Sequence, residues 1–200
     1  MNRIIQKIKD HYKKKSLFNI LSDLLFYGII ILLLIPSTRM TLVTFVKKAT
    51  LIAPLKINAP DNSKLKDSDY RWYVQSKNGE NIDLEQFKGE LIFLNFWATW
   101  CPPCVAEMPS IQSLYEEYGD KIRFIIVSRE SPEVIQEFVK KNKYTFPVYS
   151  QSASEPAIFK SQSIPTSYLI SPSGNIILKK KGAAKWDSKK IKELINTNLE

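Results

Sequence analysis

The two cysteines of this 200-residue chain, Cys101 and Cys104, stand in the stretch FWATWCPPCVAEMP (96–109). A pair with this spacing can form a structural disulfide, supply part of a metal site, or act as a reversible redox pair. As a structural link it would be weak, because closing so short a loop restricts the unfolded chain by only about 2 kcal/mol before strain. The pair also joins no distant parts of the chain.

A metal site is poorly supplied with ligands. Structural zinc takes four nitrogen or sulfur ligands, whereas the chain has two cysteines and one histidine. That histidine, His11, lies far upstream, before a long apolar segment. We therefore predict no metal and no other cofactor, and a Cu(I) ion held by the two thiolates remains the metal-binding alternative.

Reversible thiol–disulfide exchange fits the spacing best. Cys101 follows the apolar run LIFLNFW (91–97) and precedes a helical pattern that extends from Pro102 to about Tyr118, so it should cap that helix. Unpaired N–H groups and the positive end of the helix dipole favour a thiolate at such a position. We expect Cys101 to attack a partner disulfide and Cys104, one turn later, to resolve the mixed disulfide.

Strands and helices alternate around this motif. Apolar and β-branched runs predict strands, and 3.6-residue patterns with Ser, Pro and Gly at their ends predict helices. The resulting α/β fold has a mixed central sheet flanked by helices and closes with a hairpin and a final helix. The strands are expected over 70–76, 91–97, 121–128, 146–150, 165–171 and 175–181, and the helices over 102–118, 132–142, 154–161 and 188–198.

The net charge of +9 belongs to the N-terminal part of the chain. Residues 1–56 carry ten Lys and Arg against two acidic residues, and residues 57–200 carry nineteen against eighteen. The C-terminal part is therefore nearly neutral, and we predict that it does not bind nucleic acid.

An apolar segment over residues 17–35 follows six basic residues and precedes three. At about 1.5 Å per residue, a helix of this length reaches roughly the thickness of a bilayer's hydrocarbon core. The excess of positive charge before it keeps the N-terminus in the cytoplasm. A cleaved signal peptide with its apolar core at 24–35 is the alternative.

Four segments follow from this reading. We expect a cytoplasmic basic tail (1–16), a transmembrane anchor (17–35), a juxtamembrane segment and linker (36–69), and the α/β domain (70–200). The domain would lie on the periplasmic, extracytoplasmic side of the cell inner membrane, where disulfides can form.

The stretches LIFLNFWATWCPPCVAEMPSIQSLYEEY (91–118) and SIPTSYLISPSGNI (163–176) resemble the membrane-anchored TlpA/ResA/CcmG-like thiol–disulfide oxidoreductases of the thioredoxin fold. The resemblance covers about residues 70–198. It implies reduction of selected protein disulfides, such as those of apocytochrome c during cytochrome c biogenesis. Electrons would come from a membrane thiol reductase of the DsbD/CcdA type.

The resemblance also implies roles for single residues. Cys101 matches the nucleophile of this group and Cys104 the resolving cysteine. Ile164 and Pro165 match the cis-proline loop, which offers its backbone to a bound substrate; without the resemblance, Pro165 reads as a trans turn proline. Trp100, directly before the first cysteine, is expected at the substrate-binding surface, where it and Trp97 pack around the motif.

Glu107, three residues after Cys104, matches an acidic residue of this group that assists proton transfer around the cysteines. On its own it reads equally well as an exposed helix carboxylate. Thioredoxin itself has a buried Asp on the central strand, which aligns with Asn95 here. An amide cannot accept the proton of the resolving thiol, so Glu107 or solvent would have to accept it.

A thiol peroxidase of the peroxiredoxin type is the second enzymatic reading. Its reactive cysteine would attack a peroxide and pass through a sulfenic acid. The threonine that such enzymes carry three residues before that cysteine would fall at Ala98, and Thr99 stands one position too late.

Overall fold

The computed structural model describes residues 21–28 and 63–199. The chain divides into two compact units, Met1–Val43 and Thr44–Glu200. In the first unit, residues 21–28 form a helix. The predicted tail (1–16) and most of the predicted anchor (17–35) and linker (36–69) lie outside the described residues. Within the described residues, no helix has the length and apolar character needed to cross a membrane.

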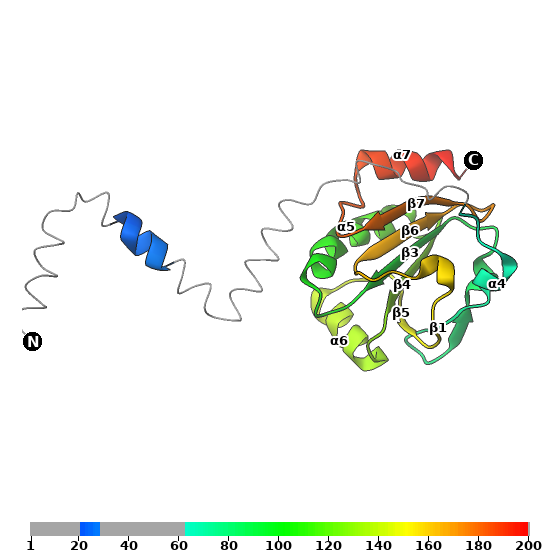
Figure 1. Cartoon of the computed structure of the whole chain (residues 1–200), viewed down its shortest axis with the longest axis horizontal. Coiled ribbons are helices and arrows are strands. Elements are labelled where there is room, and N and C mark those ends of the chain that lie inside the picture. The colour runs from blue at the N-terminus through cyan, green and yellow to red at the C-terminus, as the bar shows by residue number, and fades with distance from the viewer. Residues whose placement is uncertain (1–20, 29–62, 200) are drawn as a thin grey trace, which may run out of the picture. The chain divides into compact units, whose positions relative to one another are not determined.

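The second unit contains a mixed sheet of seven strands in the order β2-β1-β5-β4-β3-β6-β7 (Figure 1). The central strand β3 pairs in parallel with β4 and antiparallel with β6. The strands are β1 (Tyr73–Gln75), β2 (Asn81–Asp83), β3 (Ile92–Trp97), β4 (Arg123–Ser128), β5 (Val148–Gln151), β6 (Thr166–Ile170) and β7 (Ile176–Lys181). This is a thioredoxin-like α/β arrangement, as predicted.

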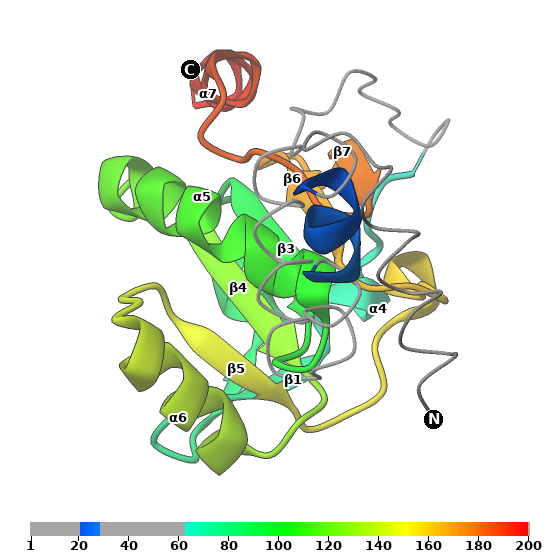
Figure 2. The same ribbon diagram turned by 90° about the vertical axis from the view of Figure 1, so that its left-hand side faces the viewer.

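The two faces of the sheet are covered differently. The helices α5 (Pro102–Tyr118), α6 (Pro132–Asn142) and α7 (Lys189–Thr197) share one hydrophobic cluster with the sheet. The short helix α4 (Asp67–Tyr70) and the single turns η1 (Leu84–Phe87) and η2 (Ala157–Phe159) belong to the opposite face. Figure 2 shows α5, α6 and α7 on one side and α4 on the other. Because both faces are covered, every residue of β3 is buried, as its continuous apolar sequence predicts.

Most predicted elements are confirmed. Helices α5 and α6 have the predicted bounds, and β6 and β7 form the predicted hairpin. The strand expected from residue 70 is shorter, because Tyr70 ends α4 and turns into the core. The helix expected over 154–161 is only the turn η2, and β2 and η1 were not predicted.

Gly119 ends α5 as predicted, but for a different reason. Its φ of −58° is right-handed, so the left-handed cap typical of glycine is not present. A Cβ atom at this position would lie 2.7 Å from the Tyr115 carbonyl oxygen. Close approach of the backbone therefore requires the glycine.

The first described residues of the second unit lie along the β6–β7 turn. The Leu65 N–H donates to the Gly174 oxygen at 2.9 Å, and the Ile176 N–H donates to the Ser63 oxygen at 3.0 Å. Because Ile170 pairs with Ile92 and Thr166 pairs with Phe96, this turn lies at the end of the sheet where β3 begins. The cysteines follow the other end of β3.

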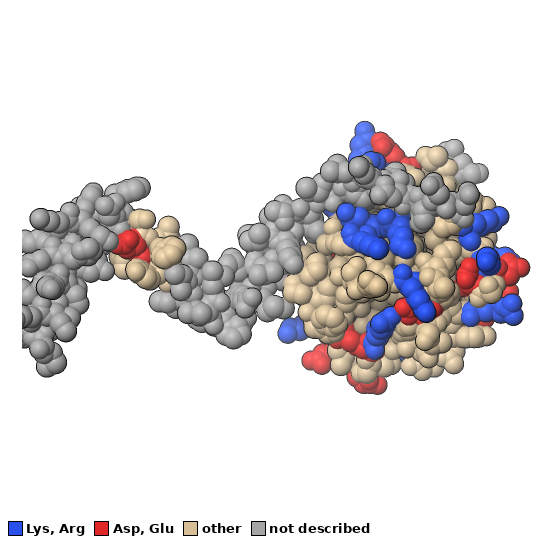
Figure 3. Space-filling model, viewed as in Figure 1, with Lys and Arg blue, Asp and Glu red and all other residues tan. Residues whose placement is uncertain are grey.

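Both outer strands of the sheet are protected from further pairing. β2 is short, and β7 carries three consecutive lysines, Lys179, Lys180 and Lys181, which disfavour edge-to-edge association. Figure 3 shows basic and acidic side chains both present on one face of this unit.

Candidate active site

The two cysteines stand where β3 gives way to α5, as predicted. Cys101 is the N-cap residue of α5 and is followed by Pro102 at the first helical position, where a missing N–H costs nothing. The two residues form a disulfide with their Cα atoms 5.3 Å apart. The Cys104 N–H donates to Sγ of Cys101 at 3.3 Å, so the helix terminus directs a donor at the sulfur that would carry negative charge.

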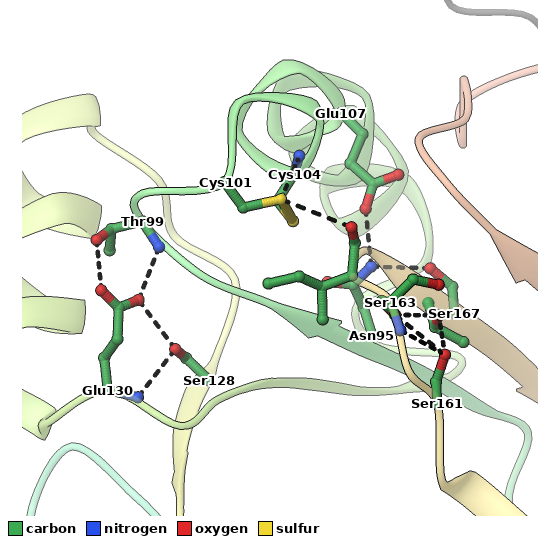
Figure 4. The surroundings of a disulfide bond; sticks show 12 residues. Asn95, Thr99, Cys101, Cys104, Glu107, Ser128, Glu130, Ser161, Ser163 and Ser167 are labelled. Carbon is green, nitrogen blue, oxygen red and sulfur yellow. Dashed lines mark hydrogen bonds between the residues drawn. A yellow bond between two sulfur atoms is a disulfide. The ribbon is translucent and has the colours of Figure 1, made fainter.

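The Ile164–Pro165 loop faces the disulfide. Its peptide bond is cis, as the resemblance implies. The Ile164 carbonyl oxygen lies 3.8 Å from Sγ of Cys101 (Figure 4). The next residue, Thr166, pairs with Phe96 of β3, so the sheet register fixes this loop beside the cysteines.

Glu107 is fully buried, so the reading of an exposed helix carboxylate is wrong. Its Oε1 accepts from Nδ2 of Asn95 at 2.9 Å, and its Oε2 accepts from the Ala184 N–H at 3.0 Å and from Nε1 of Trp186 at 2.9 Å. Burial disfavours the ionised carboxylate more than these donors favour it, and it raises the pKa of Glu107 from its ordinary value of 4.5 to about 7. A carboxyl with this pKa can gain and lose a proton near neutral pH.

Asn95 connects Glu107 to the strand that follows the cis-proline. Its Nδ2 also donates to Oγ of Ser167 on β6 at 2.8 Å, while its Oδ1 is buried without a hydrogen-bond partner among the described residues. Ser167, Ala184 and Trp186 were missed from the sequence. Of these three residues, only Trp186 could have been noticed in the sequence. It is a large aromatic residue in an otherwise small and polar stretch between β7 and the last helix.

A second carboxylate, Glu130, holds the loop that precedes Cys101. It accepts from the Thr99 N–H at 2.7 Å, from the Thr99 hydroxyl at 2.6 Å and from the Ser128 hydroxyl at 3.0 Å. Glu130 also was not singled out from the sequence. In Figure 4 the Thr99 hydroxyl points toward Glu130 and away from the cysteines, so Thr99 cannot replace the threonine that the peroxidase reading requires.

The two tryptophans of the motif differ in environment. Trp97 is buried and its ring lies 5.2 Å from that of Phe138, so it packs as predicted. Trp100 does not, since 66% of it is exposed. A hollow of about 330 Å³ lies beside the motif, and its lining includes Trp97, Trp100, Glu130, Phe159, Ser163 and Ile164. The hollow therefore adjoins the exposed Trp100 ring and the Ile164 loop.

Across residues 21–28 and 63–199, no group of three or more His, Cys, Asp or Glu side chains is arranged to hold a metal ion.

The family model described as AhpC/TSA matches residues 59–179. This chain belongs to the AhpC/TSA family. Within that family, the chain is 31% identical over 175 residues to the thiol-disulfide oxidoreductase ResA of Oceanobacillus iheyensis, and the match covers 86% of each chain.

Two solved structures are similar to this AhpC/TSA family member. StoA from Bacillus subtilis is 30% identical, with a TM-score of 0.50, over 62% of this chain and 93% of StoA. A secreted Mycobacterium tuberculosis disulfide oxidoreductase homologous to E. coli DsbE is 20% identical, with a TM-score of 0.57, over 66% of this chain and 99% of that chain. At this identity the second structure supports the fold alone.

The predicted resemblance to ResA-like proteins is therefore confirmed. This AhpC/TSA family member is a thioredoxin-like protein disulfide oxidoreductase whose substrates are protein thiols and disulfides.

Proposed function

We propose that the chain is a membrane-anchored, exported oxidoreductase that reduces selected disulfides of partner proteins through Cys101 and Cys104. The observation that carries this proposal is the position of Sγ of Cys101. This sulfur accepts a hydrogen bond from the Cys104 N–H at the start of α5 and lies 3.8 Å from the Ile164 carbonyl oxygen. A thiolate is stabilised there, next to backbone that a partner can contact.

In the reduced protein, the Cys101 thiolate attacks one sulfur of the partner's disulfide. The partner's S–S bond breaks, its other sulfur leaves as a thiolate and takes up a proton, and a mixed disulfide with Cys101 forms. The Cys104 thiol then loses its proton and attacks Sγ of Cys101. This step closes the Cys101–Cys104 disulfide and releases the partner's second thiol, so two electrons have passed to the partner.

Glu107 accepts the proton of Cys104 in this scheme. The two residues are three apart on α5 and therefore lie on the same side of the helix. The Glu107 carboxylate becomes a carboxylic acid as Cys104 becomes a thiolate. A pKa of about 7 suits this exchange, because a useful base has a pKa near the working pH.

We assign substrate binding to Ile164, Pro165 and Trp100. The Ile164 carbonyl supplies a backbone acceptor beside the disulfide. The exposed Trp100 ring supplies apolar area next to the hollow of about 330 Å³, and aromatic rings of this kind are common at protein interfaces.

The location and partners follow from the sequence and the resemblance. Residues 17–35 would anchor the chain in the cell inner membrane, with residues 70–200 on the periplasmic side. Apocytochrome c is the proposed substrate, and a membrane thiol reductase of the DsbD/CcdA type would restore the reduced pair. The support for the membrane segment is its length and the charge difference across it.

Trapping with Cys104→Ser in the full-length chain tests the proposal. Without the resolving thiol, mixed disulfides through Cys101 should accumulate in cells and survive an acid quench. The captured proteins, identified by mass spectrometry, name the substrate and the reductase. Cys101→Ser is the matched control and should capture nothing. Equal capture by both variants, or none by Cys104→Ser in cells that express the partners, would contradict the proposal.

Measuring peroxide consumption distinguishes the proposed oxidoreductase from a thiol peroxidase. A Cu(I) titration of the reduced protein distinguishes it from a metal-binding module. We expect the reduced protein to consume hydrogen peroxide no faster than Cys101→Ser does. Faster consumption, with a sulfenic acid at Cys101, would favour the peroxidase. Tight Cu(I) binding with slow disulfide exchange would favour the binding module.

A further inference from the structure

We propose that Trp186 is a positioning residue for the thiol chemistry: its indole N–H holds Oε2 of Glu107, so that Glu107 exchanges its proton through Oε1. The inference rests on the proposed role of Glu107 as the proton acceptor of Cys104. Trp186 lies 79 residues beyond Glu107 in the chain, in the connection between β7 and α7, and nothing in the CPPC motif points to it.

The geometry around Oε2 singles out Trp186. Its Nε1 donates to this oxygen at 2.9 Å, and the Ala184 N–H donates to the same oxygen at 3.0 Å. Both Trp186 and Glu107 are at most 1% exposed, so water does not compete for these hydrogen bonds. Two fixed N–H groups therefore occupy one oxygen of the carboxylate.

The indole ring is held in place from two sides. The Trp186 backbone N–H donates to Oγ of Ser110 at 3.1 Å, and that hydroxyl donates to the Glu107 carbonyl oxygen at 2.8 Å. The ring itself packs edge-on against Phe93 of β3, with the ring centroids 4.8 Å apart. Because backbone and ring are both fixed, the direction of the indole N–H is fixed as well.

The two oxygens of Glu107 are therefore unequal. A proton placed on Oε2 would face two N–H donors that have no other acceptor among residues 21–28 and 63–199, whereas a proton on Oε1 would displace only the amide of Asn95. The Oδ1 of Asn95 is buried without a partner in the described part of the chain, so a half-turn of this amide would present an acceptor to a proton on Oε1. The arrangement directs protonation to Oε1.

Among the described residues, two titratable groups lie near Glu107. The Cys104 thiol lies one turn earlier on α5, and the Lys180 ammonium of β7 acts on the carboxylate through its charge. From β3 the contact is the uncharged amide of Asn95, which also donates to the Ser167 hydroxyl of β6. After burial, the Trp186 hydrogen bond has the largest influence on the pKa of Glu107, and it lowers that pKa. Loss of the indole N–H should therefore raise the pKa further.

The test compares Trp186→Phe with Trp72→Phe in the full-length protein. Trp72 is a matched control because it is 2% exposed and its Nε1 also donates one hydrogen bond, to the Ala153 oxygen at 3.1 Å, in the core on the other face of the sheet. The reduced proteins are mixed with Ellman's reagent. The first release of thionitrobenzoate reports attack by Cys101, and the second reports resolution by Cys104. The Glu107 carboxyl carbon is titrated by NMR in parallel.

We expect Trp186→Phe to move the Glu107 titration, and the midpoint of the second phase, upward by about one pH unit, a tenfold change in the protonation equilibrium. Trp72→Phe should move neither. Equal shifts in the two variants, or an unchanged Glu107 titration in Trp186→Phe, would overturn the inference.

Glu107→Gln distinguishes this inference from the proposed function. If this variant resolves with the wild-type pH profile, Glu107 is not the acceptor, and the inference fails with it, whereas reduction through Cys101 and Cys104 is unaffected and is tested separately by trapping. If it loses that profile while Trp186→Phe keeps it, only the role of Trp186 fails. Should Trp186→Phe not fold, β-(3-benzothienyl)alanine at position 186 replaces the N–H by sulfur, keeps the ring shape, and carries the same expectation.

Discussion

Two carboxylates flank the CPPC motif, and they differ in how they are enclosed. Glu107 and Glu130 each accept three hydrogen bonds. The donors of Glu107 come from β3 and from the distant connection after β7, and its side chain is fully buried. Glu130 is half-buried at the end of β4, and its donors come from Thr99 and Ser128.

The comparison indicates that enclosure, more than the number of donors, decides what a carboxylate can do. Burial raises the pKa of Glu107 to about 7 despite its three donors, which makes it suitable for proton exchange. Glu130 keeps contact with solvent and binds both the N–H and the hydroxyl of Thr99. We therefore expect Glu130 to hold the loop before Cys101 in place.

The largest expected effect is on how folding stability depends on pH. Because folding raises the pKa of Glu107 above 4.5, its contribution to stability is complete below pH 4.5 and is lost as the pH rises through about 7. Between those values the unfolding free energy of the oxidised wild type should fall by roughly 3 kcal/mol relative to Glu107→Gln. Urea unfolding of both proteins from pH 4 to 8 measures this difference. If the unfolding free energies of the two proteins changed equally with pH, the contrast between Glu107 and Glu130 would be contradicted.

Glu130→Gln should lower folding stability without affecting proton transfer from Cys104 to Glu107. An amide replaces one acceptor by a donor that faces Thr99, so we expect a loss of about 1–2 kcal/mol of unfolding free energy. The pH profile of resolution by Cys104 should stay as in the wild type. Glu90→Gln is the control, since Glu90 forms an exposed pair with Arg123 that is worth little. A shifted resolution profile in Glu130→Gln would show that the two carboxylates are not separate in function.

Trp100 lies on the loop that Glu130 holds in place. Its replacement, Trp100→Ala, is expected to have the smallest effect on stability. Since 66% of Trp100 is exposed, the unfolding free energy should change by no more than about 0.5 kcal/mol. Reduction of a protein disulfide such as that of insulin should slow several-fold, while the reaction with Ellman's reagent keeps its rate. Equal slowing with both would mean that Trp100 acts on Cys101 itself and not on partner binding.

The sequence predicted the elements that depend on local patterns. The buried strand over 91–97 and the bounds of α5 and α6 follow from apolar periodicity and from Pro102, Ser131 and Pro132 at helix starts. Short elements such as β2 and η1 were missed because three or four residues carry too little periodicity.

The surroundings of Glu107 could not be predicted from local pattern. Its place three residues after Cys104 is visible in the sequence, but its burial depends on Ala184 and Trp186, which reach it from the far side of the hairpin. Local pattern could not predict the exposure of Trp100 either, because an aromatic residue beside a buried strand is as compatible with the core as with a surface; only the resemblance placed it at the substrate-binding surface. The membrane segment at 17–35 stays a prediction.

The attachment of Ser63 and Leu65 to the β6–β7 turn has a mechanical consequence. The turn and the sulfur atoms stand at opposite ends of β3, a strand of six residues that spans about 20 Å. A pulling force transmitted along the backbone from upstream would first strain the hydrogen bonds of Ser63 and Leu65 to the β6–β7 hairpin. It would not act directly on the disulfide. Restraint applied to the chain at Ser63 and Leu65 would therefore act at the end of the domain opposite Cys101 and Cys104.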